Sequence, residues 1–252
     1  NGIYKVAVVK LFSKVLLLSI IFVVFIGCKS TRISELVEQS PSLYLDTAFP
    51  SYKQTDIQTS DTIFMLDDEM ISVVNERILT IDDLNDRAHG LLNEIFESSI
   101  QGVNYRVGAT ITAMQAYHSN TANCLSLTIL TYALANQAGL DVEFQQVAIP
   151  EYWTRFADQN VLAKHVNILI KGSKKNSGIT YFGADIEIDF DPYTKKKKFE
   201  KTTVSKQTIL AMYYNNKGAE ALIKQDYSTA YAYIKTATEN DPLFSSAWTN
   251  LG

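Results

Sequence analysis

The stretch Cys124-Leu-Ser-Leu-Thr-Ile-Leu-Thr-Tyr-Ala-Leu-Ala-Asn-Gln-Ala138 decides the fold class of this chain. Capping-type residues precede it over 119–123, and Gly139 follows it as the left-handed residue that ends a helix. The helix predicted over residues 124–138 is apolar on nearly every face. Such a helix belongs in the middle of a domain, with other elements packed around it.

Helical and then alternating patterns surround this central helix. Apolar residues at helical spacing predict helices over residues 63–74, over 80–97 with Thr80 as the N-cap, and over 109–117. Alternation then predicts strands over 141–148, 165–170 and 179–190, with a loop through Trp153 and Arg155 after the first. Helices first and an antiparallel sheet afterwards indicate an α+β domain.

The composition excludes several classes of protein. With 252 residues, 46% hydrophobic and 20% charged, the chain lies near the globular average, so it is neither disordered, nor collagen, nor a disulfide-stapled miniprotein. Its formal charge is -4. The chain after residue 27 has 20 basic and 27 acidic residues, and its formal charge is therefore -7. That surface repels phosphate backbones and the one basic run covers only 195–198, so nucleic acid is not an expected partner.

The N-terminal residues have the pattern of a targeting signal. Three lysines precede an apolar run over 15–26 that is too short to span a bilayer comfortably. At its end, Phe25-Ile-Gly-Cys28 resembles the lipobox of bacterial lipoproteins, which implies a signal peptide over 1–27 and a lipid on Cys28. Lys29 then favours the outer membrane of the cell envelope, on the periplasmic side. The alternative is an uncleaved membrane anchor with an incidental cysteine.

Residues 28–60 are rich in Ser, Thr, Pro, Gln and Asp and indicate a lipid-anchored tether that partly packs on the domain after it. The chain begins with Asn1 and stops at Gly252, so we expect it to be a piece of a longer one.

The C-terminal segment 211–252 carries a repeat pattern. Seven residues occupy positions 4, 8, 11, 20, 24, 27 and 32 of a window starting at Ala211, which are signature positions of a tetratricopeptide repeat. They are Tyr214, Gly218, Ala221, Ala230, Ile234, Ala237 and Pro242. A second window at Ser245 has Trp248, Leu251 and Gly252 in phase. The pattern predicts one complete repeat and a truncated second one, with an unrelated helical hairpin as the alternative.

Cys124 is the first candidate for chemistry. A lone buried cysteine is usually a small hydrophobe, but Cys124 stands at a predicted helix start, where the dipole stabilises a thiolate. His165 begins a later strand. If 176–178 form a three-residue loop, opposed residues of the hairpin sum to 354, and His165 then faces Asp189. A bulge would shift the register toward a neighbouring carboxylate, Asp185 or Asp191.

These three side chains match nucleophilic catalysis. The Cys124 thiolate attacks a carbonyl, His165 takes and returns the proton, and Asp189 holds the imidazole tautomer. Backbone N–H groups around Cys124 supply part of an oxyanion hole.

A family resemblance rests on the same residues. Four segments resemble the bacterial transglutaminase-like superfamily in its form with C-terminal tetratricopeptide repeats: Asn123-Cys-Leu-Ser-Leu-Thr, Ala138-Gly-Leu, His165-Val-Asn and Ile188-Asp-Phe. The leading segments from Ser42 and from Leu66 resemble it too. The resemblance implies a papain/transglutaminase-like core over 61–205 and a catalytic triad of Cys124, His165 and Asp189. Members of that superfamily include transamidases, peptidases, amidases and proteins without demonstrated activity.

Other residues carry weaker signals. Trp153 and His118 are candidates for the wall of a substrate cleft, against ordinary loop packing and capping. His89 is expected on a helix surface. Ligand spacings for a metal and glycine-rich phosphate loops are absent from the sequence, so we expect no metal and no cofactor.

The sequence thus predicts an envelope-anchored cysteine enzyme that performs acyl transfer or hydrolysis on a peptide or amide carbonyl. Its repeats would bind a protein or peptide partner, and Cys28 would hold it to the membrane. One alternative is a non-catalytic scaffold with a vestigial triad, which a Cys124 sealed from solvent would favour. Another is an amidase acting on cell-wall peptide, which shares the chemistry and differs in substrate.

Overall fold

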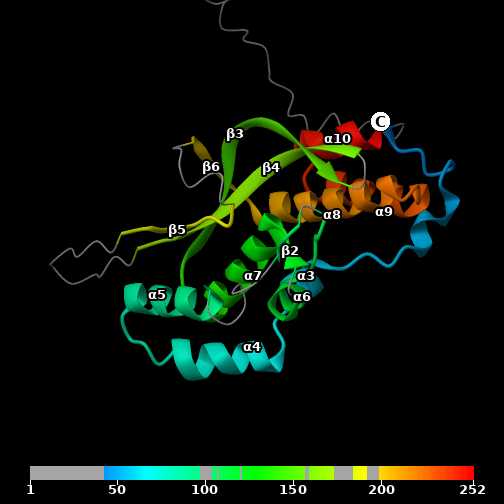
Figure 1. Ribbon diagram of the computed structural model, residues 1–252. Helices are drawn as coiled ribbons and strands as arrows, with labels where there is room; N and C mark the ends of the chain where they lie inside the picture. The colour runs from blue at the N-terminus through cyan, green and yellow to red at the C-terminus, as the bar shows by residue number, and fades with distance from the viewer. Residues whose placement is uncertain are drawn as a thin grey trace, which may run out of the picture. The chain divides into compact units, whose positions relative to one another are not determined.

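A computed structural model of the chain describes residues 43–96, 104–106, 108–119, 121–156, 159–172, 184–191 and 199–252, with the backbone alone at 104–105, 151–156 and 159–163. Residues 42–252 form one compact unit. Helices, a four-stranded antiparallel sheet and a two-stranded parallel sheet make up this unit, which confirms the α+β class (Figure 1). The predicted signal and Cys28 lie outside the described residues.

The helices and strands follow the order predicted from the sequence, helices first and the sheet afterwards. They are η2 (Pro50–Gln54), α3 (Ser60–Phe64), α4 (Asp68–Val73), η3 (Val74–Ile78), α5 (Leu84–Glu94), β1 (Asn104–Tyr105), α6 (Ala113–His118), β2 (Thr121–Ala122), α7 (Cys124–Gln137), β3 (Val142–Phe156), β4 (Gln159–Ile170), β5 (Ile186–Ile188), β6 (Lys201–Val204), α8 (Lys206–Ile223), α9 (Tyr227–Asn240) and α10 (Ser245–Leu251).

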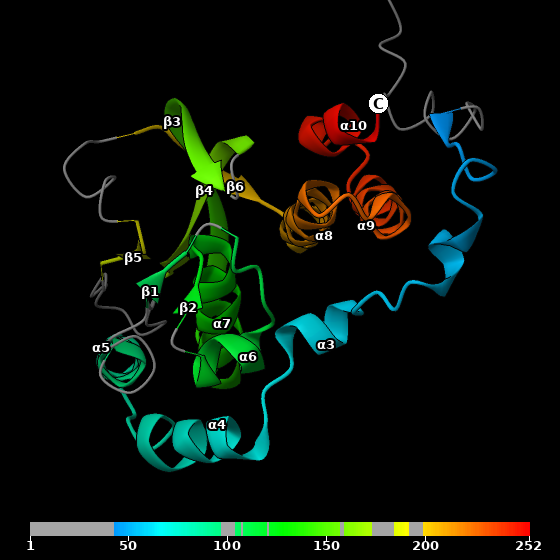
Figure 2. The same ribbon diagram turned by 45° about the vertical axis from the view of Figure 1, so that its right-hand side comes forward.

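The helix α7 lies at the centre, as its apolar sequence predicts. It packs against α3, α4, α5, α6, α8, β3 and β4 (Figures 1 and 2). Asn123 caps its start by accepting a hydrogen bond from the Ser126 N–H, and Gly139 ends it with a φ of +70°. Most of its side chains are buried from Cys124 to Ala135. Both ends and the surroundings of the predicted helix are therefore confirmed.

The four-stranded sheet has the order β5-β4-β3-β6, with every neighbouring pair antiparallel. The predicted loop through Trp153 and Arg155 is wrong, because β3 continues to Phe156. Its register against β4 shifts between Val147 and Tyr152. Pro150 lies within this irregularity. Proline has no N–H to donate, and at an irregular position the ladder loses no hydrogen bond because of it. The short edge strand β6 was not predicted either, because no alternating pattern marks it.

The helices before α7 differ from the prediction at their ends. Residues 63–74 form no single helix, because the Asp67 side chain accepts the Met70 N–H and starts a new helix, α4. The N-cap of α5 is Asp83 and not Thr80, since the Asp83 carboxylate accepts the N–H groups of Asn85 and Asp86. Several side chains in such polar stretches can cap a helix, and here the carboxylates of Asp67 and Asp83 do so.

Thr112 forms a capping box with Gln115, so α6 begins at Ala113 and not at residue 109. Of the strand predicted over 179–190, the structure describes β5, and residues 179–183 lie outside the described part of the chain.

The helices α8, α9 and α10 pack on one another beside the sheet (Figure 2). The first half of α8 belongs to the same apolar core as α7, through Ile209, Leu210, Met212, Tyr213 and Tyr214. Within the described residues, no helix combines the length and the apolar character needed to cross a membrane.

Residues 44–58 lie along α9 as a strap. Its Asp46 carboxylate accepts hydrogen bonds from Lys235 Nζ at 2.7 and 2.9 Å and from the Tyr231 hydroxyl at 2.7 Å. The hydrogen bond from Lys235, joined by that from Tyr231, lowers the pKa of Asp46 to about 2. Phe49 stacks on Tyr231 with the ring centroids 4.6 Å apart. The part of the predicted tether nearest the core is thus packed on the helices.

α8 and α9 pack tightly at Gly218. A Cβ at this position would lie 2.5 Å from Ile234 Cγ1 and 3.3 Å from the Ala230 carbonyl oxygen. We expect Gly218→Ala to destabilise the fold by about 1–2 kcal/mol, because overpacking costs about 1–3 kcal/mol while alanine regains up to about 1 kcal/mol of helix propensity. Thermal unfolding should show the melting temperature lowered by about 3–6 °C.

Gly90→Ala in α5 is the matched control for this prediction. Its added Cβ would meet the mobile end of a side chain, Ile81 Cδ1, at 2.7 Å. We expect this variant to melt at or above the wild-type temperature. Equal melting of the wild type and Gly218→Ala would contradict the close packing of the two helices.

Candidate functional site

Three of the predicted residues meet at the start of α7. His165 Nε2 in β4 donates a hydrogen bond to Asp189 Oδ1 at 2.8 Å, and Cys124 lies close enough to the imidazole to raise its pKa. The structure therefore brings a thiol, an imidazole and a carboxylate together in that order.

All three groups are largely withdrawn from solvent. Cys124 is 8% exposed and is a free thiol, and His165 is 1% exposed. The side chain of Asp189 is 13% exposed. The buried imidazole therefore has protein groups and not water as its hydrogen-bond partners, and these partners fix the orientation of the ring.

The register that led to Asp189 is wrong by two residues. Ile168 pairs with Ile188 and Ile170 with Ile186, so opposed residues sum to 356 and not to 354. The predicted turn at 176–178 lies outside the described residues. A shift of two residues moves every pair along the strand but keeps each side chain on its face.

His165 and Asp189 are still hydrogen-bonded as expected, because their side chains meet diagonally across the ladder. Asn167 Nδ2 donates to Glu187 Oε1 at 2.9 Å on the same diagonal as His165 and Asp189. The main-chain N–H of Asp191 also donates to Asp189 Oδ1 at 2.8 Å. Two N–H groups thus converge on one oxygen of Asp189 and hold its carboxylate in place.

The other two carboxylates have different positions. Asp191 Oδ2 lies 4.0 Å from His165 Nδ1, beyond hydrogen-bond distance. Asp185 accepts the Gly172 N–H at 2.9 Å near the end of the hairpin. Asp189 is therefore the carboxylate hydrogen-bonded to the imidazole.

The environment of His165 favours its charged form. Burial alone would lower the pKa of the imidazole, but the hydrogen bonds to Asp189 and Cys124 outweigh it and raise the pKa to about 10. The site thus places a proton donor beside the Cys124 sulfur.

Buried polar residues hold the helix start. Asn123 donates from Nδ2 to Thr110 Oγ1 at 2.9 Å, and its Oδ1 accepts the Ser126 N–H at 2.9 Å. Ser126 Oγ accepts the Ile111 N–H at 2.9 Å. This network was not predicted from the sequence. The Asn before the helix was a usable capping signal, but nothing local pointed to Thr110.

The remaining predicted residues lie elsewhere or outside the described side chains. His118 Nε2 pairs with Asp67 Oδ2 at 2.6 Å and so joins α6 to the start of α4. His89 is exposed on α5. Trp153 pairs with Leu162 in the β3–β4 ladder, and its side chain is outside the described part. Groups of three or more metal-ligating side chains are absent from the described residues.

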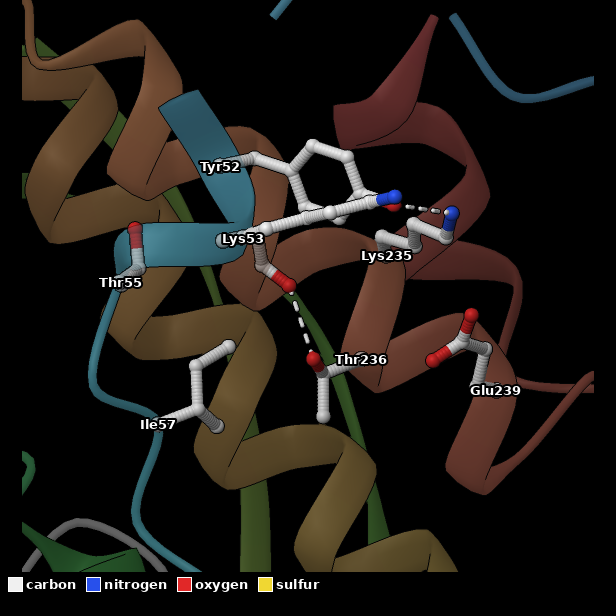
Figure 3. A pocket seen from close by; sticks show the side chains of 8 residues that line it. Tyr52, Lys53, Thr55, Ile57, Lys235, Thr236 and Glu239 are labelled. Atoms are coloured by element: carbon white, nitrogen blue, oxygen red, sulfur yellow. Dashed lines mark hydrogen bonds between the residues drawn. The ribbon is translucent and has the colours of Figure 1, made fainter. Parts of the chain in front are cut away.

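A separate pocket of about 260 Å³ lies between the strap and α9 (Figure 3). Lys235 donates there to the Tyr52 hydroxyl at 3.2 Å. The pocket is lined by Tyr52, Lys53, Thr55, Ile57, Ala232, Lys235, Thr236 and Glu239. It includes none of the three residues at the start of α7.

Comparison of the chain with protein-family models, with curated proteins and with solved structures gives no match.

Proposed function

We propose that this protein is an envelope-anchored, transglutaminase-like cysteine enzyme that performs acyl transfer or hydrolysis on a peptide or amide carbonyl. The observation that carries the proposal is the buried group of Cys124, His165 and Asp189, in which His165 is hydrogen-bonded to Asp189 and its pKa responds to Cys124. The motifs around these residues support a papain/transglutaminase-like core. That core would consist of the N-terminal helices, the central cysteine helix and the antiparallel sheet.

The chemistry follows from the three groups. The Cys124 thiolate adds to the carbonyl carbon, and N–H groups in the first turn of α7 stabilise the oxyanion that forms. His165 then gives its proton to the leaving amine, the C–N bond breaks, and a thioester remains on Cys124. Water or a second amine attacks the thioester while His165 accepts its proton. The acyl group leaves as an acid or a new amide, and Asp189 holds the ring throughout.

The C-terminal helices support the second half of the proposal. Gly218, Ala230 and Ile234 occupy signature positions of the repeat window, and these three residues lie against one another between α8 and α9. We propose a tetratricopeptide segment over 211–252 that binds a protein or peptide partner. A lipid on Cys28 would place both parts at the envelope membrane.

The test is activity profiling of the full-length protein. Glutamine-containing proteins, unmodified peptides and cell-wall peptide fragments would be offered with and without a primary amine. We expect release of an amine product from at least one panel member by the wild type and none by Cys124→Ser. The panel member consumed distinguishes a transamidase or peptidase from a wall amidase. Equal turnover by the wild type and Cys124→Ser would contradict the proposal.

The scaffold alternative also has an observation in its favour. Cys124 is only 8% exposed, and a substrate carbonyl has to reach its sulfur. If the alternative holds, the profiling gives no product for any panel member, while a partner recovered with the full-length protein is lost when α8–α10 are disrupted by Gly218→Val.

A further inference from the structure

A chain of hydrogen bonds joins α8 to the residue that caps α7. Glu220 Oε1, near the end of α8, accepts the main-chain N–H of Thr110 at 3.3 Å. Thr110 Oγ1 in turn accepts from Asn123 Nδ2 at 2.9 Å. Asn123 directly precedes Cys124, and its Oδ1 caps the helix at the Ser126 N–H. Two hydrogen bonds thus connect the Glu220 carboxylate to Asn123, the N-cap residue next to Cys124.

The Glu220 side chain is 14% exposed, and the groups beyond it in this chain of hydrogen bonds are buried. Thr110 is 2% exposed, Asn123 4% and Ser126 0%. Buried polar groups must find partners within the protein. Loss of the Glu220 acceptor would leave the Thr110 N–H unsatisfied, and the segment around it would have to move toward another acceptor or toward water.

A movement of that segment would displace both Asn123 and Ser126, because both are hydrogen-bonded to it. Besides the bond to Thr110, the main-chain N–H of Asn123 donates to the Ala109 carbonyl at 3.3 Å. The hydroxyl of Ser126 lies 3.1 Å from the same carbonyl oxygen. The segment that Glu220 holds is therefore the one that orients both Asn123 and the first turn of α7.

We propose that Glu220 is a positioning residue for Cys124, an inference that rests on the proposed cysteine chemistry. Glu220 fixes the segment 109–112, which fixes the amide of Asn123 and thereby the place of the sulfur relative to His165. The acceptor oxygen carries this role. The Lys217 ion pair, whose Nζ lies 3.5 Å from Glu220 Oε2, does not.

The experiment follows iodoacetamide labelling of Cys124 in the full chain from pH 5 to pH 9, with mass spectrometry of the Cys124 peptide. Glu220→Ala removes the acceptor, Glu220→Gln keeps a carbonyl oxygen, and Lys217→Ala removes the ion pair alone. We expect Glu220→Ala to slow labelling at pH 6 about threefold and to change the pH dependence. Glu220→Gln and Lys217→Ala should match the wild type.

A general loosening of the fold would expose Cys124 and speed its labelling at every pH, so the pH profile separates positioning from simple destabilisation. If Glu220→Ala fails to fold, Thr110→Val tests the next link, because it removes the acceptor for Asn123 and keeps the main-chain N–H. A wild-type profile in Glu220→Ala, or in Thr110→Val where that variant is needed, overturns the inference and leaves the proposed function standing. A labelling rate that does not depend on His165 overturns the proposed function, and the inference falls with it.

Discussion

Replacing His165 with alanine should lower acyl-transfer turnover on the order of 10⁵-fold, since removal of the base from a nucleophile–histidine pair costs nearly as much as removal of the whole catalytic group. The same variant should slow iodoacetamide labelling of Cys124 at pH 6 about tenfold. A thiol that titrates like free cysteine is only roughly 0.3% thiolate at that pH. The greater nucleophilicity of such a thiolate offsets part of the loss.

His118→Ala is the matched control for His165→Ala. Its imidazole is paired with Asp67, so we expect neither turnover nor labelling to change beyond twofold. Equal labelling of His165→Ala and the wild type at pH 6 would show that the imidazole does not activate the sulfur.

Truncation after Ser205 should abolish the folded state of the remaining chain. The first half of α8 buries five large side chains in the core that surrounds α7: Ile209, Leu210, Met212, Tyr213 and Tyr214. At about 1.5–3 kcal/mol each, their loss amounts to roughly 7–15 kcal/mol. That is as large as the whole stability of a typical domain. Circular dichroism and thermal unfolding would check this expectation.

The control for the truncation removes α10 alone, residues 245–252. This helix buries one side chain, Ala247, so the shortened protein should still unfold cooperatively. A cooperative unfolding transition in the chain cut after Ser205 would show that the core folds without α8. The predicted boundary near residue 205 would then separate two independent domains.

The central helix and the site around it could be predicted because the signals are local. Residues 124–138 have caps at both ends and apolar side chains on every face, and these features do not depend on the rest of the chain. The pairing of His165 with Asp189 was reached through a register that is off by two. It still placed the two side chains on one face, because a sheet alternates with a period of two.

The remaining features depend on contacts between residues far apart in sequence. Whether β3 ends at Pro150 or continues past it is decided by its pairing with β4, which no property of the proline reveals. Glu220 and Thr110 are 110 positions apart, and each is an ordinary polar residue in its own surroundings. The strap over 44–58 likewise looks like a tether until Asp46 is seen against Lys235.

The central claim is that His165 is an imidazolium held between Cys124 and Asp189, and NMR titration of the histidine rings tests it most directly. The chain has three histidines, so His89→Ala and His118→Ala assign the signals. Because the pKa of His165 is raised to about 10, its ring should stay charged from pH 6 to about pH 9. In Cys124→Ala it should lose its proton at lower pH. A His165 ring that is neutral at pH 8 in the wild type would contradict the account.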